Sequence, residues 1–315
     1  MEARLSDVRR DVAGDLLALL PVGLTLAECR QPISGFLDVV SKVAGRRDVE
    51  PRGLAVRTRL HLPRVARPDG TVGRRLALAE AIRSARHLSA DIAAIRGLVP
   101  SGGIRRLDDL RFVVYDDDKA FAVFTHMHYL RSARPGSVNF ALVDRSSGLP
   151  VALCSATPLD WQRLGGALEQ RYGVLLEEVW DISRVYSFQV APHNAISRLL
   201  AEVRRWFRRE RRDASLLVTT VDPNLGFTGT SYRAANWQEW LRVRPRPYLY
   251  LYRQYVSPRQ LRLEFGSASR HDLHERLGVR LEVSKAALLD SSIYCCRLRG
   301  STDPVPLDQL PRLRR

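Results

Sequence analysis

The chain has 315 residues, which is long enough to bury a full hydrophobic core and favours about two domains, and its 45% hydrophobic content is that of a folded protein. Its formal net charge is +16 at pH 7, and all basic residues except Lys42, Lys119 and Lys285 are arginine. A codon bias also explains the preference for arginine, but it does not set the sign of the net charge. A pI near 10.5 therefore indicates an anionic partner, of which nucleic acid is the commonest.

The cysteines and the apolar segments exclude several classes of protein. Cys29, Cys154, Cys295 and Cys296 form no Cys-x-x-Cys pair and have no zinc-site spacing, so we expect neither a structural metal nor a disulfide framework. The apolar run 16–27 is interrupted by a proline, is too short to span a bilayer and follows acidic residues that do not suit a signal peptide. We therefore expect a cytoplasmic protein without a membrane segment.

The N-terminal third is predicted to differ from the rest. Residues 1–108 have the pattern of a largely helical, basic region with a turn or hairpin tip at 64–75. The string "LRFVVYDDDK" (110–119) predicts a strand that ends in three aspartates. These can cap the helix predicted over 119–130, because a carboxylate accepts hydrogen bonds from the unpaired N–H groups of a first turn.

Strands and helices then alternate up to residue 255. The predicted elements are an antiparallel hairpin over 137–157, a strand over 177–188, an amphipathic helix over 193–212 with Asn194 as N-cap, a strand over 214–222, a turn and short helix within 226–240 and a strand over 247–255. This order predicts an α/β fold with one mixed central sheet flanked by helices. A helix N-terminus that opens near the end of a strand would be a natural anion site.

We accordingly expect three segments. A helical N-terminal region over 1–108 precedes the α/β core over 109–256, and a basic extension occupies 257–315. That extension is predicted to be helical in part of 271–289 and to contain one more strand at 291–299, followed by a frayed proline- and arginine-rich tail.

The predicted core resembles a known fold and a known family. Its hairpin, strand, amphipathic helix, strand and short helix resemble the acyltransferase fold of the GNAT superfamily. The strings "HYLRSARPGS" (128–137), "ISRVY" (182–186), "PHNAISRLLAE" (192–202) and "VDPNLGFTGTSYRAANW" (221–237) resemble the phage Mu Mom family of DNA-modification proteins. They are also similar to the Druantia-type antiphage defence protein. The resemblance covers roughly residues 120–255.

The resemblance to Mom implies modification of adenine in DNA at its exocyclic nitrogen, with a carbamoylmethyl-type group that shields the DNA from restriction. By motif position, the family's functional residues fall on His128, Tyr129, Arg184, Asp222 and Tyr232.

The donor and any metal are left open. GNAT proteins that bind acetyl-CoA usually carry a glycine-rich turn after the fourth strand, whereas "VAPHNAISR" (190–198) has no glycine. An acyl-CoA or another small donor could still bind there through backbone N–H groups. We expect Ser183, Asn194 and Ala195 to form that cofactor site.

Several of these residues have a structural alternative. In a helix, His126 and His128 point about 200° apart and cannot share a metal. His128 then either faces a cleft with Tyr129 or caps the helix. The alternation in strand 177–188 puts Arg184 on one apolar face with Ile182, Tyr186 and Phe188, so its guanidinium needs an anion, which is either a structural aspartate or a substrate.

The segment after the next strand also allows two interpretations. Asp222 is either a general base for the exocyclic amine or the start of an Asp-Pro turn. In the short helix, Tyr232 could donate a proton or stack on a base, while Asn236, four residues later, could pair with an adenine edge. Trp237 is either a substrate contact or a core anchor. Arg134, in the loop after the first helix, is assigned to substrate binding.

The amphipathic helix carries many arginines, opposed within it only by Glu202 and Glu210. This charge is either a solvated face or a surface that contacts DNA phosphates. The residues assigned to DNA binding are Arg204, Arg205, Arg208, Arg209, Arg211 and Arg212.

These patterns predict first a DNA-modifying transferase on double-stranded DNA, encoded by a phage or prophage. The alternatives are a nucleic-acid-binding defence component that has the same scaffold without transfer chemistry, and an acyltransferase on another substrate. The sequence does not determine the oligomeric state.

Overall fold

A computed structural model describes residues 93–100, 106–128, 130, 132–188, 190–223, 227–247, 249–251, 254–283 and 289–314. The helical region and hairpin tip predicted within residues 1–92 lie outside the described residues. The chain divides into a larger unit (Ile95–Asp222, Phe227–Pro245 and Asp290–Arg315) and a smaller unit, to which Arg246–Leu289 belongs. This division differs from the three consecutive segments expected from the sequence, because the end of the chain returns to the larger unit.

The larger unit is built on one eight-stranded sheet in the order β1-β2-β3-β4-β5-β10-β6-β11. Neighbouring strands are antiparallel except for the parallel pairs β4–β5 and β6–β11. The predicted mixed sheet is therefore confirmed. The strands are β1 (Leu110–Val114), β2 (Val138–Asp144), β3 (Pro150–Pro158), β4 (Val179–Ser187), β5 (Leu216–Val221), β6 (Gln238–Val243), β10 (Ser291–Arg297) and β11 (Arg312–Leu313).

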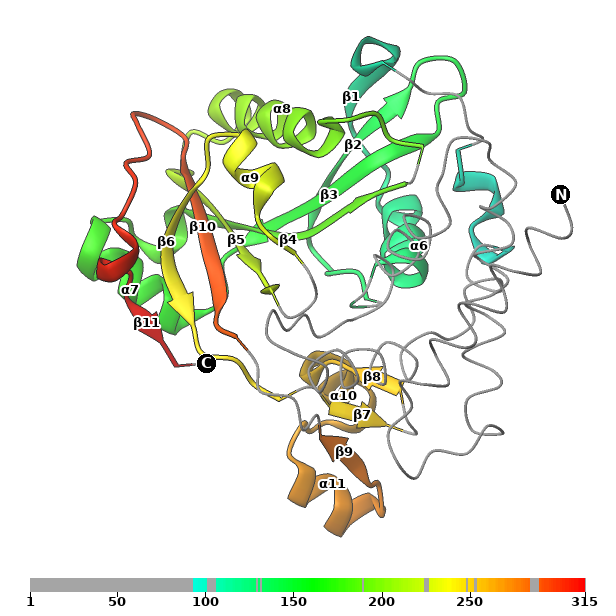
Figure 1. The fold of residues 1–315 in the computed structure, drawn as a ribbon. Coiled ribbons are helices and arrows are strands. Elements are labelled where there is room, and N and C mark those ends of the chain that lie inside the picture. Colours follow the sequence, from blue (N-terminus) through cyan, green and yellow to red (C-terminus); the bar gives the residue numbers. More distant parts are fainter. Residues whose placement is uncertain are drawn as a thin grey trace, which may run out of the picture. The chain divides into compact units, whose positions relative to one another are not determined.

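Helices cover both faces of this sheet (Figure 1). Two of them, α8 (Ala195–Glu210) and α9 (Thr230–Ala234), lie on one face, and α6 (Asp117–Met127) and α7 (Gln162–Tyr172) lie on the other. The sequence did not predict α7. Short 3-10 turns occur at η2 (Arg96–Leu98), η3 (Leu107–Asp109), η4 (Leu176–Glu178) and η6 (Leu307–Gln309). No helix in the described ranges is both long and apolar enough to cross a bilayer.

Local sequence explains where the first elements begin and turn. The Asp116 carboxylate caps α6 by accepting a 2.9 Å hydrogen bond from the Lys119 N–H group, as predicted. In the β2–β3 hairpin, the Asp144 carboxylate accepts hydrogen bonds from the hydroxyls of Ser146 and Ser147 and from the Ser147 N–H group. These bonds lower the pKa of Asp144 to about 2.

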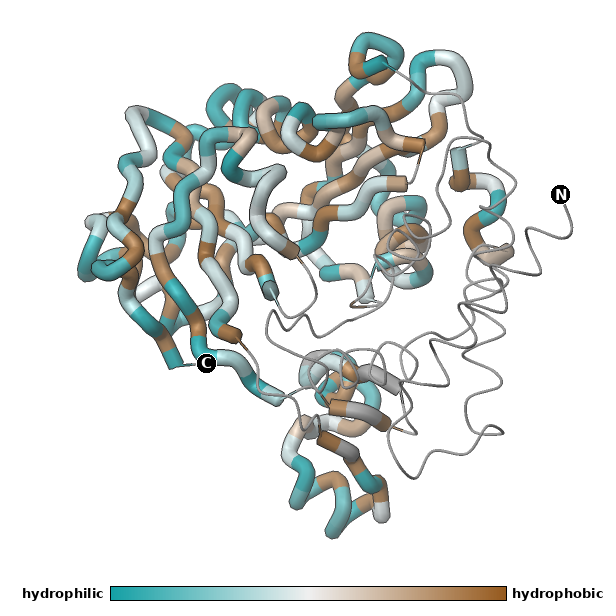
Figure 2. The backbone as a smooth tube through the Cα atoms, viewed as in Figure 1, coloured by the Kyte–Doolittle hydropathy of each residue, from teal (hydrophilic) through white to brown (hydrophobic). Residues whose placement is uncertain are grey.

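The core on the α8 face holds the amphipathic helix to the sheet. Leu199, Leu200, Val203 and Phe207 are fully buried, and the Phe207 ring packs edge-on against Trp180 of β4 at a centroid distance of 5.1 Å. Figure 2 follows this pattern: hydrophobic positions concentrate in the strands, whereas α8 mixes hydrophilic and hydrophobic positions. A second buried cluster joins α7 to the opposite face of the same sheet.

The C-terminal end of the chain is ordered, which corrects the prediction of a frayed tail. The predicted strand at 291–299 is β10, inserted between β5 and β6. The sequence did not predict β6. Beyond β10, the Trp240 indole donates a 2.8 Å hydrogen bond to the Asp303 carbonyl, and β11 pairs with β6. Tertiary contacts therefore fix a segment whose composition suggested disorder.

The smaller unit has its own core. The strand predicted over 247–255 is two short strands, β7 (Leu249–Leu251) and β8 (Gln254–Val256), which form a sheet with β9 (Leu281–Val283) in the order β8-β7-β9. Helices α10 (Pro258–Phe265) and α11 (Arg270–Leu277) contribute Leu261 and Leu273 to its buried cluster. The helix expected within 271–289 is confirmed as α11.

Ending the chain after Gly300 should lower its stability. The truncation removes β11 and the carbonyl that accepts the Trp240 indole N–H bond, and an unsatisfied buried donor costs about 1–3 kcal/mol. We expect a lower urea midpoint of tryptophan fluorescence. The control Asp303→Ala keeps the backbone acceptor and should change stability by no more than about 0.5 kcal/mol. An unchanged midpoint in the truncated chain would contradict this role of the tail.

Candidate functional site

The main feature of the larger unit is the parting of β4 and β5. The two parallel strands pair only at Val179↔Leu216, Trp180↔Leu217 and Asp181↔Val218, although β4 continues to Ser187 and β5 to Val221. At the point of parting, the Thr219 hydroxyl donates a 2.9 Å hydrogen bond to the Ile182 carbonyl. Beyond it, no backbone ladder joins the facing edges of the two described strands, so these edges are available to another extended molecule.

A β-bulge in β4 coincides with this parting. Ser155 of β3 lies opposite Arg184, but Ala156 lies opposite Ile182, so Ser183 is an extra residue in β4. An extra residue bends its strand and reverses the alternation of side chains beyond it. Ile182 therefore joins the core on the α8 face, where Val185 also packs, whereas Arg184 and Tyr186 lie on the opposite face. The prediction that Ile182, Arg184, Tyr186 and Phe188 share one face was wrong.

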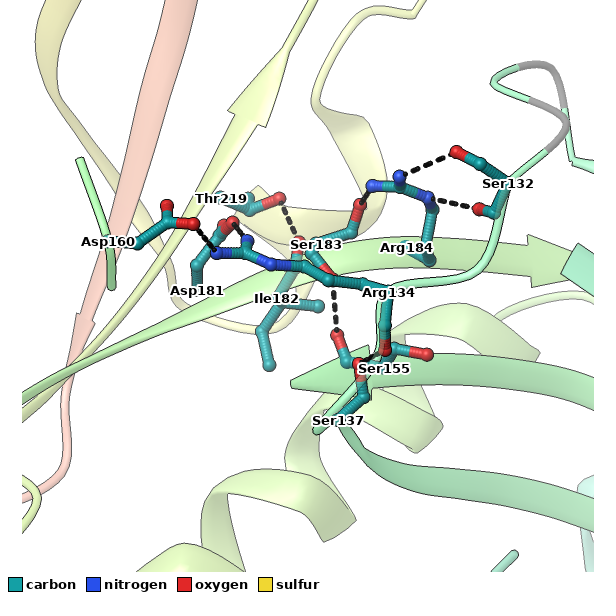
Figure 3. Close-up of polar contacts among 10 residues, drawn as sticks. All are labelled: Ser132, Arg134, Ser137, Ser155, Asp160, Asp181, Ile182, Ser183, Arg184 and Thr219. Carbon is teal, nitrogen blue, oxygen red and sulfur yellow. Dashed lines mark hydrogen bonds and ion pairs between the residues drawn. The ribbon is translucent and has the colours of Figure 1, made fainter. Parts of the chain in front are cut away.

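Arg184 is held by the loop that follows α6 (Figure 3). Its guanidinium donates to the Ser132 carbonyl at 2.9 Å, to the Ser132 hydroxyl at 3.1 Å and to the Ser183 carbonyl at 2.6 Å. The Arg184 charge also acts on the half-buried Asp181 carboxyl, where it opposes the rise in pKa that burial causes. An aspartate of the protein thus supplies nearby negative charge, which is one of the two alternatives that the sequence left open.

Arg134 is part of a charge network on the same face. Its guanidinium contacts the Asp181 carboxylate at 2.8 Å and the Asp160 carboxylate at 2.7 Å, and the Asp160 side chain is 76% exposed (Figure 3). Burial raises the pKa of the Asp181 carboxyl, while the charges of Arg134 and Arg184 oppose that rise. Arg134, assigned to substrate binding, therefore has a structural partner in Asp181.

His128 is a buried, neutral histidine at the C-cap of α6. Burial, and secondarily the charge of Arg184, hold its pKa well below the usual value. Its Nδ1 accepts a 3.2 Å hydrogen bond from the Leu130 N–H group, so its proton is on Nε2. The adjacent Tyr129 lies outside the described residues. His128 and Arg184 thus lie close enough for the charge of Arg184 to act on the imidazole.

Asp222 and Tyr232 come from the other side of the parting. Asp222 follows the last residue of β5 directly and is half-buried. Tyr232 lies in α9, where its ring packs edge-on against Trp237 at 5.6 Å and stacks on Tyr294 of β10 at 5.8 Å. The family residues therefore lie on both faces of the sheet, with Asp222 at the end of a strand between them.

The structure decides the places of two residues of the "GTSYRAANW" string. The helix ends at Ala234, and Asn236 follows it in a left-handed turn with φ of 61°, so Tyr232 and Asn236 do not share a helical face. The Asn236 side chain is exposed. Trp237 is fully buried in the core, which agrees with the alternative of a core anchor.

The predicted donor site has an unusual helix start. Asn194 occupies the N-cap position of α8 but adopts a left-handed conformation with φ of 66°, and its side chain makes no capping hydrogen bond, which corrects the predicted cap. Ala195 is buried, and Ser183 is the bulged residue. The Ala195 N–H group donates to the Pro192 carbonyl at 3.2 Å, so the N–H groups that follow it in the first turn are the ones that suit an anionic group.

The arginines of α8 are partly neutralised within the protein. Arg205 pairs with Glu202, Arg209 with Glu210 and Arg211 with Asp213, and Arg211 also covers the Trp180 ring at 4.3 Å. Within the described ranges, Arg208 and Arg212 are exposed and form no ion pair, whereas the Nε of Arg204 is buried. The exposed charge is therefore concentrated on Arg208 and Arg212, with Arg205 and Arg209 beside them.

Sequence reasoning missed Asp181 and Tyr294, and it gave Arg233 no role. Asp181 alternates with apolar residues in its strand, and nothing in that pattern marks it as the partner of Arg134. The partners of Tyr294 lie some 60 residues earlier in the chain, so no local signal marks it. No group of three or more metal-binding side chains occurs among the residues that the structure describes.

Replacing Arg134 by Met should destabilise the protein, because it leaves Asp181 in a buried site with less opposing charge. Breaking a fully buried pair costs about 3–5 kcal/mol, and the 21% exposure of the Asp181 side chain places this pair at or below the lower end. The pKa of Asp181 is higher in the folded protein than in the unfolded chain, so the free energy of unfolding falls as pH rises from the unfolded-state pKa to the folded-state pKa. Without the Arg134 charge, the folded-state pKa rises further, and this pH range extends upward. Urea unfolding should therefore reveal a larger loss at about pH 8 than at about pH 5.

The control is Asp160→Asn, which breaks only the exposed half of the Arg134 network and should cost at most about 1 kcal/mol. If Arg134→Met lost the same unfolding free energy at both pH values, the proposed effect of Arg134 on the Asp181 carboxyl would be wrong.

A model of the Mom protein family matches residues 109–285, more than half of the chain. No curated protein matches it. Similar solved structures include a proposed acetyltransferase from Sphaerobacter thermophilus (13% identity, 60% of this chain, 93% of that chain, TM-score 0.31). Another is yncA, a proposed acetyltransferase from Salmonella typhimurium with its cofactor acetyl-CoA (10% identity, 62% and 98%, TM-score 0.37). The family match, rather than these low TM-scores, identifies the chain, which belongs to the Mom protein family.

Proposed function

We propose that this protein is a transferase that adds a group of acyl or carbamoylmethyl type to the exocyclic amine of adenine in double-stranded DNA. The modification would protect the DNA of a phage or prophage from restriction in the host cytoplasm. Family membership supports the reaction class, and the net charge of +16 supports DNA as the partner. The observation that carries the proposal is the parting of β4 and β5 beside the N-terminus of α8.

The parted strands suit a small donor that combines amide groups with an anionic end, such as an acyl-CoA. The edge of β4 beyond Asp181 offers backbone groups to the donor's amides, and the uncapped first turn of α8 offers N–H groups to a phosphate. The missing glycine does not argue against this fit. Asn194 already has the left-handed backbone that glycine usually supplies in such turns.

Asp222 is the proposed general base. It follows β5 at the C-terminal ends of the parallel pair, where ligands of α/β sheets collect. The exocyclic nitrogen of adenine would form a bond to the donor carbon while its proton passes to Asp222. With a thioester donor, the carbon–sulfur bond breaks and the thiolate leaves. Tyr232 would then protonate the leaving group or stack on the base, while Arg184 and His128 line the opposite side.

The target base must first leave the duplex, because a stacked adenine hides its exocyclic nitrogen from an enclosed site. The exposed arginines near the C-terminal end of α8 are the proposed contacts to the DNA backbone. Arg208 and Arg212 would bind phosphates directly, because they form no ion pair among the described residues. They lie more than ten residues beyond the start of α8, or roughly 20 Å along its axis, so they would dock the duplex rather than contact the reacting base.

The substitution Asp222→Asn should abolish the modification. Nucleosides from cells that express the natural chain should include a heavier adenine nucleoside by mass spectrometry, and the variant should yield at least about 100-fold less because its amide cannot accept the proton. DNA binding by the purified variant, with its salt dependence, should be unchanged.

The matched control is Asp213→Asn, an exposed aspartate just before β5, which should keep the modification. If Asp222→Asn still modified adenine, Asp222 would not be the general base. If the natural chain yields no heavier nucleoside but binds DNA, it is instead a DNA-binding component without transfer chemistry.

The α8 arginines can be tested separately by DNA binding. Arg208→Ala and Arg212→Ala should each weaken binding to any duplex and reduce the slope of log K against log salt by about 1, because each removes one phosphate contact. Arg145→Ala removes an exposed arginine from the β2–β3 turn and should leave both quantities unchanged. Equal effects from all three variants would mean that only the net charge matters.

A further inference from the structure

We propose that Tyr294 of β10 is a positioning residue for Tyr232, and this inference rests on the proposed function, in which Tyr232 contacts the reacting groups. The Tyr294 ring stacks on the Tyr232 ring with centroids 5.8 Å apart and planes inclined by 24°. Trp237 contacts Tyr232 edge-on at 5.6 Å. Two buried rings thus fix the orientation of the Tyr232 ring.

The Tyr294 hydroxyl is joined to α9 through Arg233. The Arg233 Nη1 group donates to the Tyr294 hydroxyl at 2.7 Å and to the Thr228 carbonyl at 2.8 Å, and its Nη2 group donates to the Thr230 hydroxyl at 3.3 Å. Hydrogen bonds from a charged donor are stronger than neutral ones. One guanidinium therefore ties the turn before α9 to the side chain of Tyr294.

Gly229 indicates how closely this turn is fitted to Tyr294. Its φ is 72°, a left-handed conformation that side chains disfavour, and a Cβ atom at this position would lie 2.5 Å from both Cζ and the hydroxyl of Tyr294. The backbone at Gly229 thus passes directly against the Tyr294 phenol. Glycine is required here both for the backbone conformation and for this contact.

The helix that carries Tyr232 cannot position itself. With five residues, α9 is far below the length at which a helix is stable alone, so its place depends on tertiary contacts. These contacts include one from α8, where the Ser197 hydroxyl donates to the Ser231 carbonyl at 3.3 Å, and those of Tyr294. Tyr294 supplies a contact from the central sheet.

The strand that carries Tyr294 also pairs with β5, the strand that Asp222 follows. Tyr294 lies opposite Thr219 of β5 on one side and Glu239 of β6 on the other, so it belongs to a strand paired along both edges. Asp222 follows the same β5 strand, three residues after Thr219. Tyr294 thus connects α9 to the strand that carries the proposed base. It lies outside residues 109–285, the part of the chain that matches the family model.

The test is Tyr294→Phe, which keeps the ring that stacks on Tyr232 but removes the hydroxyl that binds Arg233. We expect kcat for adenine modification to fall about tenfold, because small displacements of a reacting group reduce turnover, while KM for DNA stays within about twofold. Arg233→Lys should also lower kcat, because an ammonium cannot bond to Tyr294, Thr228 and Thr230 in the same geometry.

The matched control is Tyr172→Phe. The Tyr172 ring stacks on Trp240 at 4.3 Å and its hydroxyl donates to the Trp240 carbonyl at 3.0 Å, but it packs on the α7 face of the sheet. Both Phe variants should lower Tm by similar small amounts, and only Tyr294→Phe should lower kcat. A kcat within about twofold of the natural chain for Tyr294→Phe would overturn the positioning role.

Amide hydrogen exchange tests this inference independently of catalysis. If the natural chain makes no modified adenine, the proposed function is wrong, but the exchange rates of the amides in 230–237 still show whether Tyr294 holds α9 in place. Exchange about tenfold faster in Tyr294→Phe than in Tyr172→Phe would support it, because the hydroxyl then holds α9 in place. Equal exchange in the two variants would overturn it.

Discussion

The extra residue in β4 is the constraint on which the site depends. With Ser183 inserted opposite the Ser155–Ala156 step, β4 bends, and its parallel pairing with β5 ends after three residue pairs. A regular β4 would continue the ladder and occupy the backbone groups that face β5. The bulge therefore opens the middle of an otherwise continuous sheet, at the end where α8 begins and Asp222 follows β5.

The two faces of the sheet stabilise this opening in different ways. On the α6 face, the buried Arg134 and Arg184 and the half-buried Asp181 form a charge network with the neutral His128 beside it. Such a network tolerates little change, because each member compensates the charge or desolvation of another. On the α8 face, Tyr232, Trp237 and Tyr294 form an aromatic cluster whose contacts are mainly apolar. Ionic contacts thus define one side of the parting, and packed rings define the other.

The basic character of the chain is also organised rather than uniform. In α8, Glu202 pairs with Arg198 and Arg205, and Glu210 pairs with Arg209. Just beyond the helix, Arg211 pairs with Asp213 and lies over Trp180. Part of the arginine charge at this helix is therefore paired within the protein. The part left for a polyanion is smaller and lies toward the C-terminal end of α8, away from the helix start that suits a donor. The two anionic molecules of the proposed reaction could then bind at opposite ends of one helix.

The sequence by itself determined the elements whose signals are local. The amphipathic period of α8, the hairpin of β2 and β3 and the Asp116 cap each depend on residues within one element or turn, so they were predictable. The resemblance to Mom also singled out Arg184, Asp222 and Tyr232, and their roles stay a prediction. Tertiary structure alone decided which face Arg184 occupies, because a bulge depends on the register with β3. It likewise decided that Trp237 is core and that Tyr294 packs on Tyr232, because β10 enters the sheet between β5 and β6 from the far end of the chain. Pattern and propensity describe neighbours in sequence, whereas strand order and register are set by burial against residues far away in it.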